Sequence, residues 1–402
     1  MSKRRVAITG VGAVTPLGVG ARTLHERWVA GCGGIEDGVG RAADFEPEAF
    51  ITRKEARRTE RFTQLAIAAC EEALAEAGWA DGLPYDPDRI GCVIGTGVGG
   101  LATIEDQHDV LHERGEKAVS PFGVPMMMTN AAAGALAMRH GLTGPNWGVV
   151  SACASGAHAI GTAVRLVQCG EVDAIVTGGA ESCVTPLTVA SFAKMSATSK
   201  VGISRPFDAR RDGFVMGEGA GVLVLEDLEA AERRGAKVLG EILGYGATSD
   251  AFHLTAPQPG GAGAAKAIAA ALGEAGVAPA DVHYVNAHGT STPLNDRAET
   301  DALKTALGER AHEIPVSALK SSIGHLLGAG GAVEAVATVL ALRDRIAPPT
   351  LNYEEPEEGL DLDYVPGAPK PLPGRGEVPR AVAISNSFGF GGHNAVLCIA
   401  DA

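Results

Sequence analysis

The sequence predicts an α/β protein built from two similar halves, and two observations support this prediction. Short β-branched runs alternate with alanine-rich windows along the chain, a pattern typical of sheets flanked by helices. In addition, FVMGEGAGVLVLED (214–227) and FGFGGHNAVLCIAD (388–401) have equal length and share Phe, Gly, Val, Leu and Asp at matching offsets. We therefore predict a duplication, with halves spanning residues 1–245 and 246–402.

The individual elements follow from local periodicity. Strands are expected at the β-branched runs RRVAITG, RIGCVIGTG, WGVVSA, DAIVTGG, GVLVLED, VHYVNAHG, IPVSAL, AVAISNS and AVLCIAD. A helix is expected over residues 62–78, because its apolar side chains recur at helical spacing and Gly78 suits its C-terminal end. The residues on that apolar face are Phe62, Leu65, Ala66, Ala69, Ala73 and Ala77.

Composition limits the functional classes. The chain has 402 residues, 46% of them hydrophobic, and a net charge of −14, so it lacks the basic excess of a general nucleic-acid binder. No apolar run reaches the roughly 18–20 residues of a membrane span, and MSKRRVAITG does not have the pattern of a signal peptide. The seven cysteines are scattered without CxxC pairs, which favours a reducing compartment and argues against a zinc site. We expect a cytoplasmic protein with no membrane or nucleic-acid partner.

Cys153 is the first candidate for chemistry. It lies between WGVVSA and ASGAHAIGTAVRLV, so it is expected where a strand ends and a helix begins. Unpaired N–H groups and the positive end of the helix dipole stabilise a thiolate at such a place. Most free cysteines are nevertheless buried packing residues, so Cys153 taken alone leaves both interpretations open.

Two histidines in the second half support a catalytic interpretation. His288 lies in NAHGTSTPLNDRAE, and His325 lies in SALKSSIGHLLGAGGAVEA together with Lys320 and Glu334. Each is expected in a glycine-rich, polar loop directly after a strand, where catalytic groups tend to gather. The glycine-rich loops VIGTGVGG and FGFGGHN lack the pattern of a dinucleotide-binding turn, so tight turns explain them better.

With these motifs together, the sequence resembles the β-ketoacyl-acyl-carrier-protein synthases, and most closely the synthase II subtype. The resemblance is carried by SACASG, RPFDARRDGFVMGEGAG, NAHGTSTP, KSSIGHLLGAGGAVEA and NSFGFGGHN, which occur in family order. It implies a thiolase fold, in which two βαβαβ halves form a five-layer α-β-α-β-α core, usually as a homodimer. It also implies an acyltransferase that condenses malonyl-ACP with a cysteine-bound acyl group in fatty acid elongation, without a metal or other cofactor.

The resemblance assigns roles to individual residues. Cys153 is the nucleophile, His288 and His325 complete a Cys-His-His set, and Phe390 is a mobile gate. Lys320 supports the second histidine through an ion pair with Glu299 or Glu334, and Asp296 belongs to the same polar cluster. The remaining assignments are pantetheine contacts by Thr290 and Thr292, an acyl-pocket position near a dimer interface at Ile104, and carrier-protein docking by Lys54, Arg57 and Arg58.

Some positions depart from the synthase II pattern and leave alternatives open. Ser155 stands where many members have Thr, Asn295 replaces a common Gly, and His393 replaces a frequent Thr. A mycolic-acid-type synthase, or a ketosynthase of a type II polyketide or specialised-metabolite pathway, shares several of these variants. A non-catalytic chain-length factor is the alternative of a different class, and Cys153 with both histidines argues against it. A thiolase would need a second catalytic cysteine near the C-terminus, whereas Cys398 lies in an apolar run.

Overall fold

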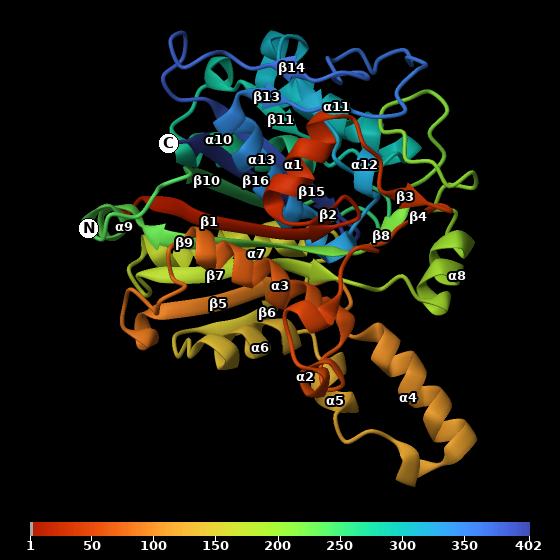
Figure 1. Ribbon diagram of the computed structural model, residues 1–402. Helices are drawn as coiled ribbons and strands as arrows, with labels where there is room; N and C mark the ends of the chain where they lie inside the picture. Colours follow the sequence, from red (N-terminus) through yellow and green to blue (C-terminus); the bar gives the residue numbers. More distant parts are fainter. Residues whose placement is uncertain (1–2) are drawn as a thin grey trace.

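Strands from both halves of the chain join in one large sheet (Figure 1). The computed structural model describes residues 3–402. The spatial order of the sheet is β12-β11-β15-β16-β10-β1-β9-β7-β5-β6, with β2 paired to β1. Its strands are β1 (Val6–Thr15), β2 (Gly18–Val19), β5 (Ile90–Gly95), β6 (Asn146–Val149), β7 (Ala174–Glu181), β9 (Gly219–Asp227), β10 (Gly240–Ser249), β11 (Tyr284–Asn286), β12 (Val316–Ser317), β15 (Val382–Gly389) and β16 (His393–Asp401).

Helices and two small sheets complete the architecture. The helices are α1 (Ala21–Val29), α2 (Arg53–Ala56), α3 (Arg61–Glu76), α4 (Leu101–Arg114), α5 (Gly123–Met127), α6 (Ala131–His140), α7 (Ser155–Gln168), α8 (Pro186–Lys194), α9 (Leu228–Arg233), α10 (Ala262–Ala275), α11 (Pro293–Leu307), α12 (Lys320–Ile323) and α13 (Gly330–Asp344). The small sheets pair β3 (Ile35–Glu36), β4 (Val39–Gly40) and β8 (Met216–Gly217), and β13 (Ile346–Ala347) with β14 (Lys370–Pro371).

The predicted duplication is visible in the strand order. The order β6-β5-β7-β9-β1 in the first half matches β12-β11-β15-β16-β10 in the second, with the same parallel and antiparallel pairings. The two similar sequence segments end in β9 and β16, which are equivalent strands. Residue 245, the predicted boundary, lies inside β10, which pairs with β1 on one side and β16 on the other.

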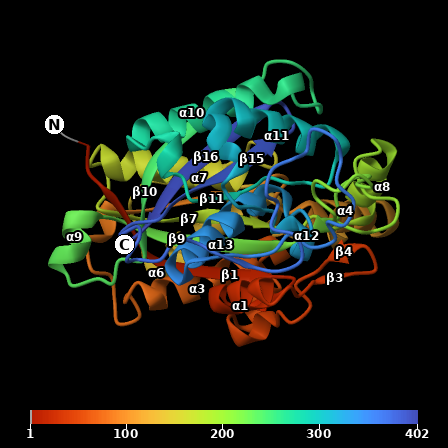
Figure 2. The ribbon, with the colours of Figure 1, turned by 90° about the horizontal axis from the view of Figure 1, so that it is seen from above.

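Five layers follow from how the helices pack. α3 and α6 cover the outer face of the first half-sheet, and α10 and α11 cover that of the second, on the opposite side of the molecule (Figure 2). α7 and α13 lie between the half-sheets and contact each other. Every residue of α13 from Gly330 to Leu342 is buried, as expected for a helix enclosed on all sides. The predicted thiolase-type, five-layer fold is confirmed.

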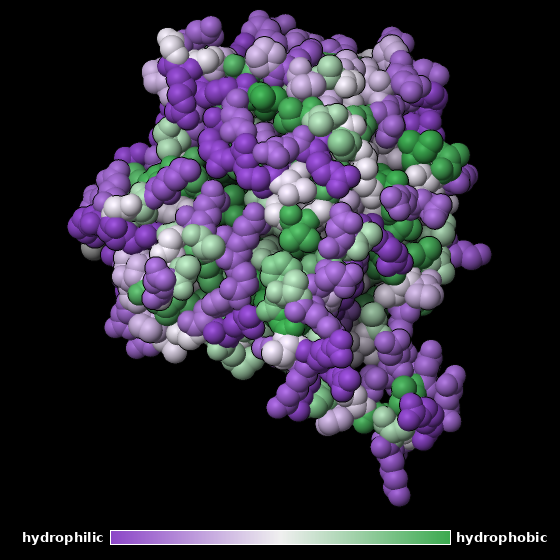
Figure 3. Space-filling view, in the orientation of Figure 1, coloured by the Kyte–Doolittle hydropathy of each residue, from purple (hydrophilic) through white to green (hydrophobic). Residues whose placement is uncertain are grey.

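The helix predicted over residues 62–78 is α3, and the side chains predicted for its apolar face are buried. Outside this body, α4 and the loop after it project as an arm, whose visible face in Figure 3 is largely hydrophilic. Among residues 3–402, no helix is both long and apolar enough to cross a membrane.

Candidate active site

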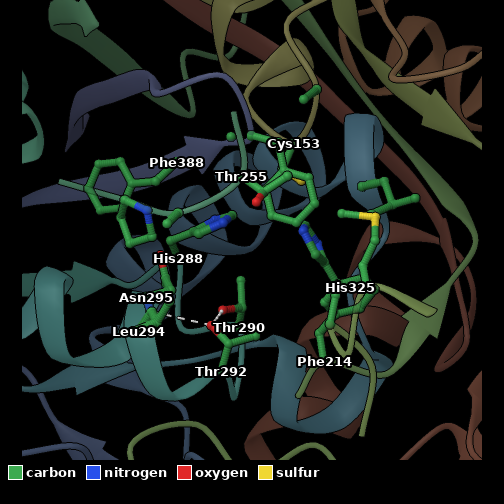
Figure 4. Close-up of a pocket in the computed structure, with 18 of the residues that line it drawn as sticks. Cys153, Phe214, Thr255, His288, Thr290, Thr292, Leu294, Asn295, His325 and Phe388 are labelled. Carbon is green, nitrogen blue, oxygen red and sulfur yellow. Dashed lines mark hydrogen bonds between the residues drawn. The ribbon is translucent and has the colours of Figure 1, made fainter. Parts of the chain in front are cut away.

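The three residues expected to react line one cavity of about 430 Å³. Cys153 precedes α7 of the first half, whereas His288 follows β11 and His325 follows α12 in the second half. Figure 4 shows both imidazoles directed toward Cys153. The prediction of a strand-to-helix junction holds for Cys153, and His288 does follow a strand. His325 differs from expectation, because α12 intervenes between β12 and its loop.

Cys153 is held in a tight turn at the start of α7. Ala152 has φ of 50°, a left-handed conformation that side-chain-bearing residues rarely adopt. The Ser155 hydroxyl closes this turn, since it accepts from Ser151 N at 2.9 Å and donates to the Ala152 carbonyl at 2.6 Å. A Cβ at Gly389 would lie 2.9 Å from Ser151 O, so only glycine lets the end of β15 approach this closely. The strained turn therefore brings the thiol and the segment after β15 together.

The environment of Cys153 keeps its thiol protonated. Burial raises the pKa of Cys153 to about 11, and the nearby charge of Lys320 opposes this rise. The stabilisation of a thiolate by the helix N-terminus therefore stays a prediction, and burial of the sulfur acts against it. The backbone N–H groups of Phe390 and of Cys153 lie near the sulfur and lower the pKa of the thiol. Two donors thus converge where an oxyanion on a sulfur-bound carbon would form.

His288 and His325 are buried and neutral. Burial lowers the pKa of both well below the ordinary value, and the charge of Lys320 lowers each further. Their ring centroids are 5.4 Å apart and their planes nearly perpendicular. Lys320 Nζ lies 3.4 Å from His288 Nδ1 and donates to it, so neutral His288 carries its proton on Nε2. The site therefore contains a neutral N–H donor whose ring orientation is fixed by a lysine.

The Lys320 partner is Glu334. Lys320 Nζ pairs with Glu334 Oε1, and both side chains are only 2% exposed. Glu299 instead accepts from the backbone N–H groups of His288 and Gly289, each at 2.8 Å, and from Asn386 at 3.0 Å. The predicted ion pair of Lys320 with Glu299 or Glu334 is therefore formed with Glu334, and backbone donors occupy the Glu299 carboxylate.

Asp296 and the two threonines support the loop that carries His288. Asp296 is buried and accepts from Phe207 N at 2.8 Å. Thr290 and Thr292 line the cavity with their hydroxyls 2.9 Å apart, and Thr292 also caps α11 by accepting from Asn295 N at 3.3 Å. Their contact with pantetheine stays a prediction.

The predicted peripheral positions lie outside this cavity. Ile104 is 42% exposed on α4 and is not among the cavity-lining residues, so its place in an acyl pocket stays a prediction. Lys54, Arg57 and Arg58 are exposed in and just after α2, and within residues 3–402 none of the three forms an ion pair. Arg58 lies 4.6 Å from the centroid of the Phe122 ring. The docking role of these cations likewise stays a prediction.

The cavity also contains residues that the sequence analysis did not single out. Phe192, Phe214 and Phe388 form aromatic walls, and the Phe214 ring packs edge-on against His325 with centroids 5.3 Å apart. Asp250 accepts from Asn394 Nδ2 at 2.7 Å beside the segment that carries Phe390. Phe214, Phe388 and Asn394 lie within the quoted motifs, which was the available signal, whereas Asp250 lies in GATSD without any distinguishing pattern.

Comparisons with known proteins agree with this geometry. Residues 35–231 match the family model of the beta-ketoacyl synthase N-terminal domain, and residues 239–354 match that of the C-terminal domain. The 3-oxoacyl-[acyl-carrier-protein] synthase 2 of Synechocystis sp. is 48% identical over 417 residues, which cover 99% of this chain and 98% of that protein. The protein of the same name from Staphylococcus aureus is 44% identical, covering 98% and 97%.

Solved structures give the same picture. A beta-ketoacyl synthase from Burkholderia phymatum superposes with a TM-score of 0.90 at 35% identity, covering 99% of this chain and 100% of that one. A type II PKS acyl-carrier protein in complex with its ketosynthase gives a TM-score of 0.89 at 30% identity, with both chains fully covered. The fold is thus shared over nearly the full length of these chains.

Proposed function

The chain belongs to the beta-ketoacyl synthase family, and on this premise we propose that it makes 3-oxoacyl-ACP in fatty acid chain elongation by condensing malonyl-ACP with an acyl group held on Cys153. One observation carries the proposal: Cys153, His288 and His325 line one cavity, and two backbone N–H groups converge on the thiol. These groups match the needs of a thioester-forming and enolate-forming reaction.

The first step transfers the acyl group. Cys153 Sγ attacks the thioester carbonyl of acyl-ACP, and the backbone N–H groups of Cys153 and Phe390 stabilise the tetrahedral oxyanion. The carbon–sulfur bond to pantetheine then breaks, and the proton lost by Cys153 ends on the leaving thiol. Because burial keeps the resting thiol protonated, thiolate forms only as substrate arrives and a proton acceptor becomes available.

The second step forms and uses the enolate. The bond between the carboxylate and the α-carbon of malonyl-ACP breaks, carbon dioxide leaves, and the electron pair delocalises onto the thioester oxygen. Neutral His288 and His325 donate N–H groups to this oxygen. The enolate carbon attacks the acyl-Cys153 carbonyl, the carbon–sulfur bond breaks, and Cys153 takes up a proton. The cycle balances without electron transfer, so we propose that it needs no redox or metal cofactor.

The proposed partners are acyl carrier protein and a second copy of this chain. Exposed Lys54, Arg57 and Arg58 offer positive charge to an acidic carrier protein. We propose that the condensation takes place in the cytoplasm. β6 lies at the edge of the sheet with Trp147 and Val150 37% and 53% exposed. Pairing of two such edges in a homodimer would satisfy their backbone groups and cover these side chains.

Intact-protein mass spectrometry tests the proposed function. The protein is incubated with a panel of acyl-ACP thioesters beside Cys153→Ala. We expect a mass gain of one acyl group in the wild type and none in the variant, followed by release as 3-oxoacyl-ACP when malonyl-ACP is added. No loading from any straight-chain donor would overturn the assignment to fatty acid elongation.

A further inference from the structure

Glu181 is a fully buried carboxylate beside the active site that the proposed mechanism does not use. It is the last residue of β7, is 0% exposed, and within residues 3–402 forms no ion pair with any lysine or arginine. A charge-bearing group without a cation is costly to bury, so it is retained only where several hydrogen bonds compensate for lost hydration. The compensating donors of Glu181 identify its role.

Donors to Glu181 come from two segments that are distant in sequence. From the loop after β5, Thr96 Oγ1 donates at 2.9 Å, Gly97 N at 2.5 Å and Val98 N at 3.4 Å. From the 3₁₀ turn η7 (Leu327–Ala329), Gly328 N donates at 3.1 Å. Gly97 and Val98 line the reaction cavity, as does Leu327, which lies two residues after His325. One carboxylate therefore ties a wall of the cavity to the segment that carries a catalytic histidine.

The backbone of Gly97 and Gly328 approaches the Glu181 carboxylate closely. A Cβ at Gly97 or at Gly328 would lie 2.7 Å from Glu181 Oε2, and one at Gly328 would also lie 2.0 Å from Gly97 N, so the bridge depends on glycine at Gly328. The same turn also packs on the nucleophile helix, because a Cβ at Gly156 would lie 3.0 Å from Gly328 O. A shift of the η7 turn would therefore move the His325 segment relative to Cys153.

The second half of the molecule uses an equivalent arrangement. There Glu299 accepts from the backbone N–H groups of His288 and Gly289 in the loop after β11, the strand equivalent to β5. In both halves a buried carboxylate thus fixes the loop after the same strand. Glu299 orients one histidine directly, and Glu181 reaches across the half-sheets to the segment of the other.

We propose that Glu181 is a positioning residue for condensation, which holds the cavity wall at Gly97–Val98 and the His325 segment in register with Cys153. This inference rests on the proposed function, since it assigns a role within that reaction. Glu181 contacts no reacting atom in this role and acts through the two backbone segments that it binds.

The test compares Glu181→Gln with Glu60→Gln. A glutamine keeps the size of the side chain but turns an NH₂ group toward N–H donors, so the bridge loses its acceptors on that side. Glu60 is a suitable control because it is also a buried carboxylate near Glu181 but, within the described residues 3–402, its side chain accepts hydrogen bonds only from Phe62 N and Ser182 Oγ. We expect Glu181→Gln to lower kcat for condensation about 10-fold or more with little change in KM. Glu60→Gln should keep both constants near the wild-type values.

A second readout separates positioning from a general loss of structure. The titratable groups near Glu181 are Cys153, Cys183 and Glu60, and the charge of Lys320 also acts on Cys153. The negative charge of Glu181 raises the pKa of Cys153, so its removal is expected to move the pH midpoint of Cys153 alkylation by iodoacetamide downward. Wild-type kcat in folded Glu181→Gln would overturn the proposal, and an unchanged alkylation midpoint would refute the charge effect of Glu181 on Cys153.

Thr96→Val covers the case in which Glu181→Gln does not fold. It removes one donor to the carboxylate and is expected to lower kcat in the same direction by a smaller factor; an unchanged kcat would then count against the proposal. Alkylation needs no carrier protein, so it also separates the two hypotheses. Absence of condensation by the wild type would refute the proposed function. A shift of the alkylation midpoint on Glu181→Gln would still show the charge effect of Glu181 on Cys153.

Discussion

The two halves of this molecule share a strand order but contribute different chemistry. The helix that follows β6 in the first half begins just after Cys153, the proposed nucleophile, whereas the equivalent region between β12 and α13 in the second half carries Lys320 and His325. The loop after β5 supplies a cavity wall, whereas the loop after β11 supplies His288. The sheet and helices position the loops, and the loops decide which half holds the acyl group and which stabilises the enolate.

The glycine pattern shows how closely the two frames agree. A Cβ at Gly12 of β1 would lie 2.0 Å from Ala69 O of α3, and a Cβ at Gly246 of β10 would lie 2.0 Å from Ala267 O of α10. The pairing of β1 with β9 shifts register between Ile8 and Gly10, and that of β10 with β16 shifts at the equivalent place. The duplicated frame is therefore conserved in its bulges and close contacts, while the loops differ.

Removal of the Cys153 thiol, which the first half contributes, has the largest expected effect on the rate of condensation. Cys153→Ala should lower the rate of condensation by about 10³-fold or more, because no other group accepts the acyl chain. Decarboxylation of malonyl-ACP should persist, since the enolate donors lie in the second half. Labelled carbon dioxide release measured beside 3-oxoacyl-ACP formation checks both outcomes, and a parallel loss of both would contradict the division of labour.

Removal of the His325 imidazole, an N–H donor of the second half, should slow decarboxylation while acyl loading of Cys153 continues. His325→Ala is expected to slow decarboxylation by about 10²–10³-fold, the usual cost of one donor to a developing oxyanion. Acyl loading of Cys153, followed by mass spectrometry, should continue because the oxyanion donors for that step are the backbone groups of Cys153 and Phe390. Failure of loading in a folded variant would show that His325 also serves the first half.

Lys320→Met should affect stability as well as both halves of the site. It leaves Glu334 buried without its cation, and we expect a loss of about 3–5 kcal/mol in the free energy of unfolding. Because Lys320 lowers the pKa of Cys153 and of both histidines, its removal should move Cys153 alkylation to higher pH. Adding Glu334→Leu should restore much of the stability in urea titrations but not the alkylation profile. Restoration of both would refute the electrostatic role of Lys320.

Equivalent glycines provide a direct test of the duplicated frame. Gly12→Ala and Gly246→Ala should each destabilise the protein by about 1–3 kcal/mol, because each new Cβ meets a helix carbonyl oxygen. Gly273→Ala in α10 is the control, since no atom lies within 4 Å of its added Cβ and alanine favours a helix. Thermal unfolding of the three variants distinguishes the cases. Markedly unequal losses for Gly12 and Gly246 would show that the two close contacts are not energetically equivalent.

The smallest expected effect concerns carrier-protein docking. Replacement of Arg57 and Arg58 by Glu should raise KM for acyl-ACP by about 10-fold at low salt, with the difference shrinking as salt increases. Lys266→Glu, at an exposed position of α10, reverses one positive charge away from α2 and should leave KM unchanged. Equal KM values for the Arg57/Arg58 variant and for Lys266→Glu would show that the α2 region does not dock the carrier protein.

Much of the fold, and the candidate residues that line one cavity, could be predicted because their signals are local. The similar segments 214–227 and 388–401 correspond to equivalent strands, and Cys153, His288 and His325 lie in short glycine-rich motifs. The pKa of Cys153 was not predictable from the turn alone, because burial of the thiol in the folded protein raises it. Sequence spacing shows a helix end but not the depth at which the thiol is buried.

Contacts across long sequence separations explain the remaining differences. Glu181 binds backbone groups 84 and 147 residues away, and backbone donors leave no periodic pattern in a sequence. The choice between Glu299 and Glu334 for Lys320 depended on which carboxylate the backbone of His288 already occupied. Ile104 lies on the projecting arm, whose environment in an assembly is not encoded in nearby residues.

The packing of α7 against α13 has a consequence for the history of this duplicated chain. A Cβ at Gly156 would lie 2.8 Å from Ala332 N, and one at Gly331 would lie 3.0 Å from Ala157 N, so the two helices meet backbone to backbone. At this contact no layer of side chains lies between the two helices, so repacking of side chains cannot compensate for a shift of one half relative to the other. After gene duplication, the two copies were free to diverge in their loops but had to remain matched along this seam, so neither half can be exchanged for that of a distant relative without replacing both helices together.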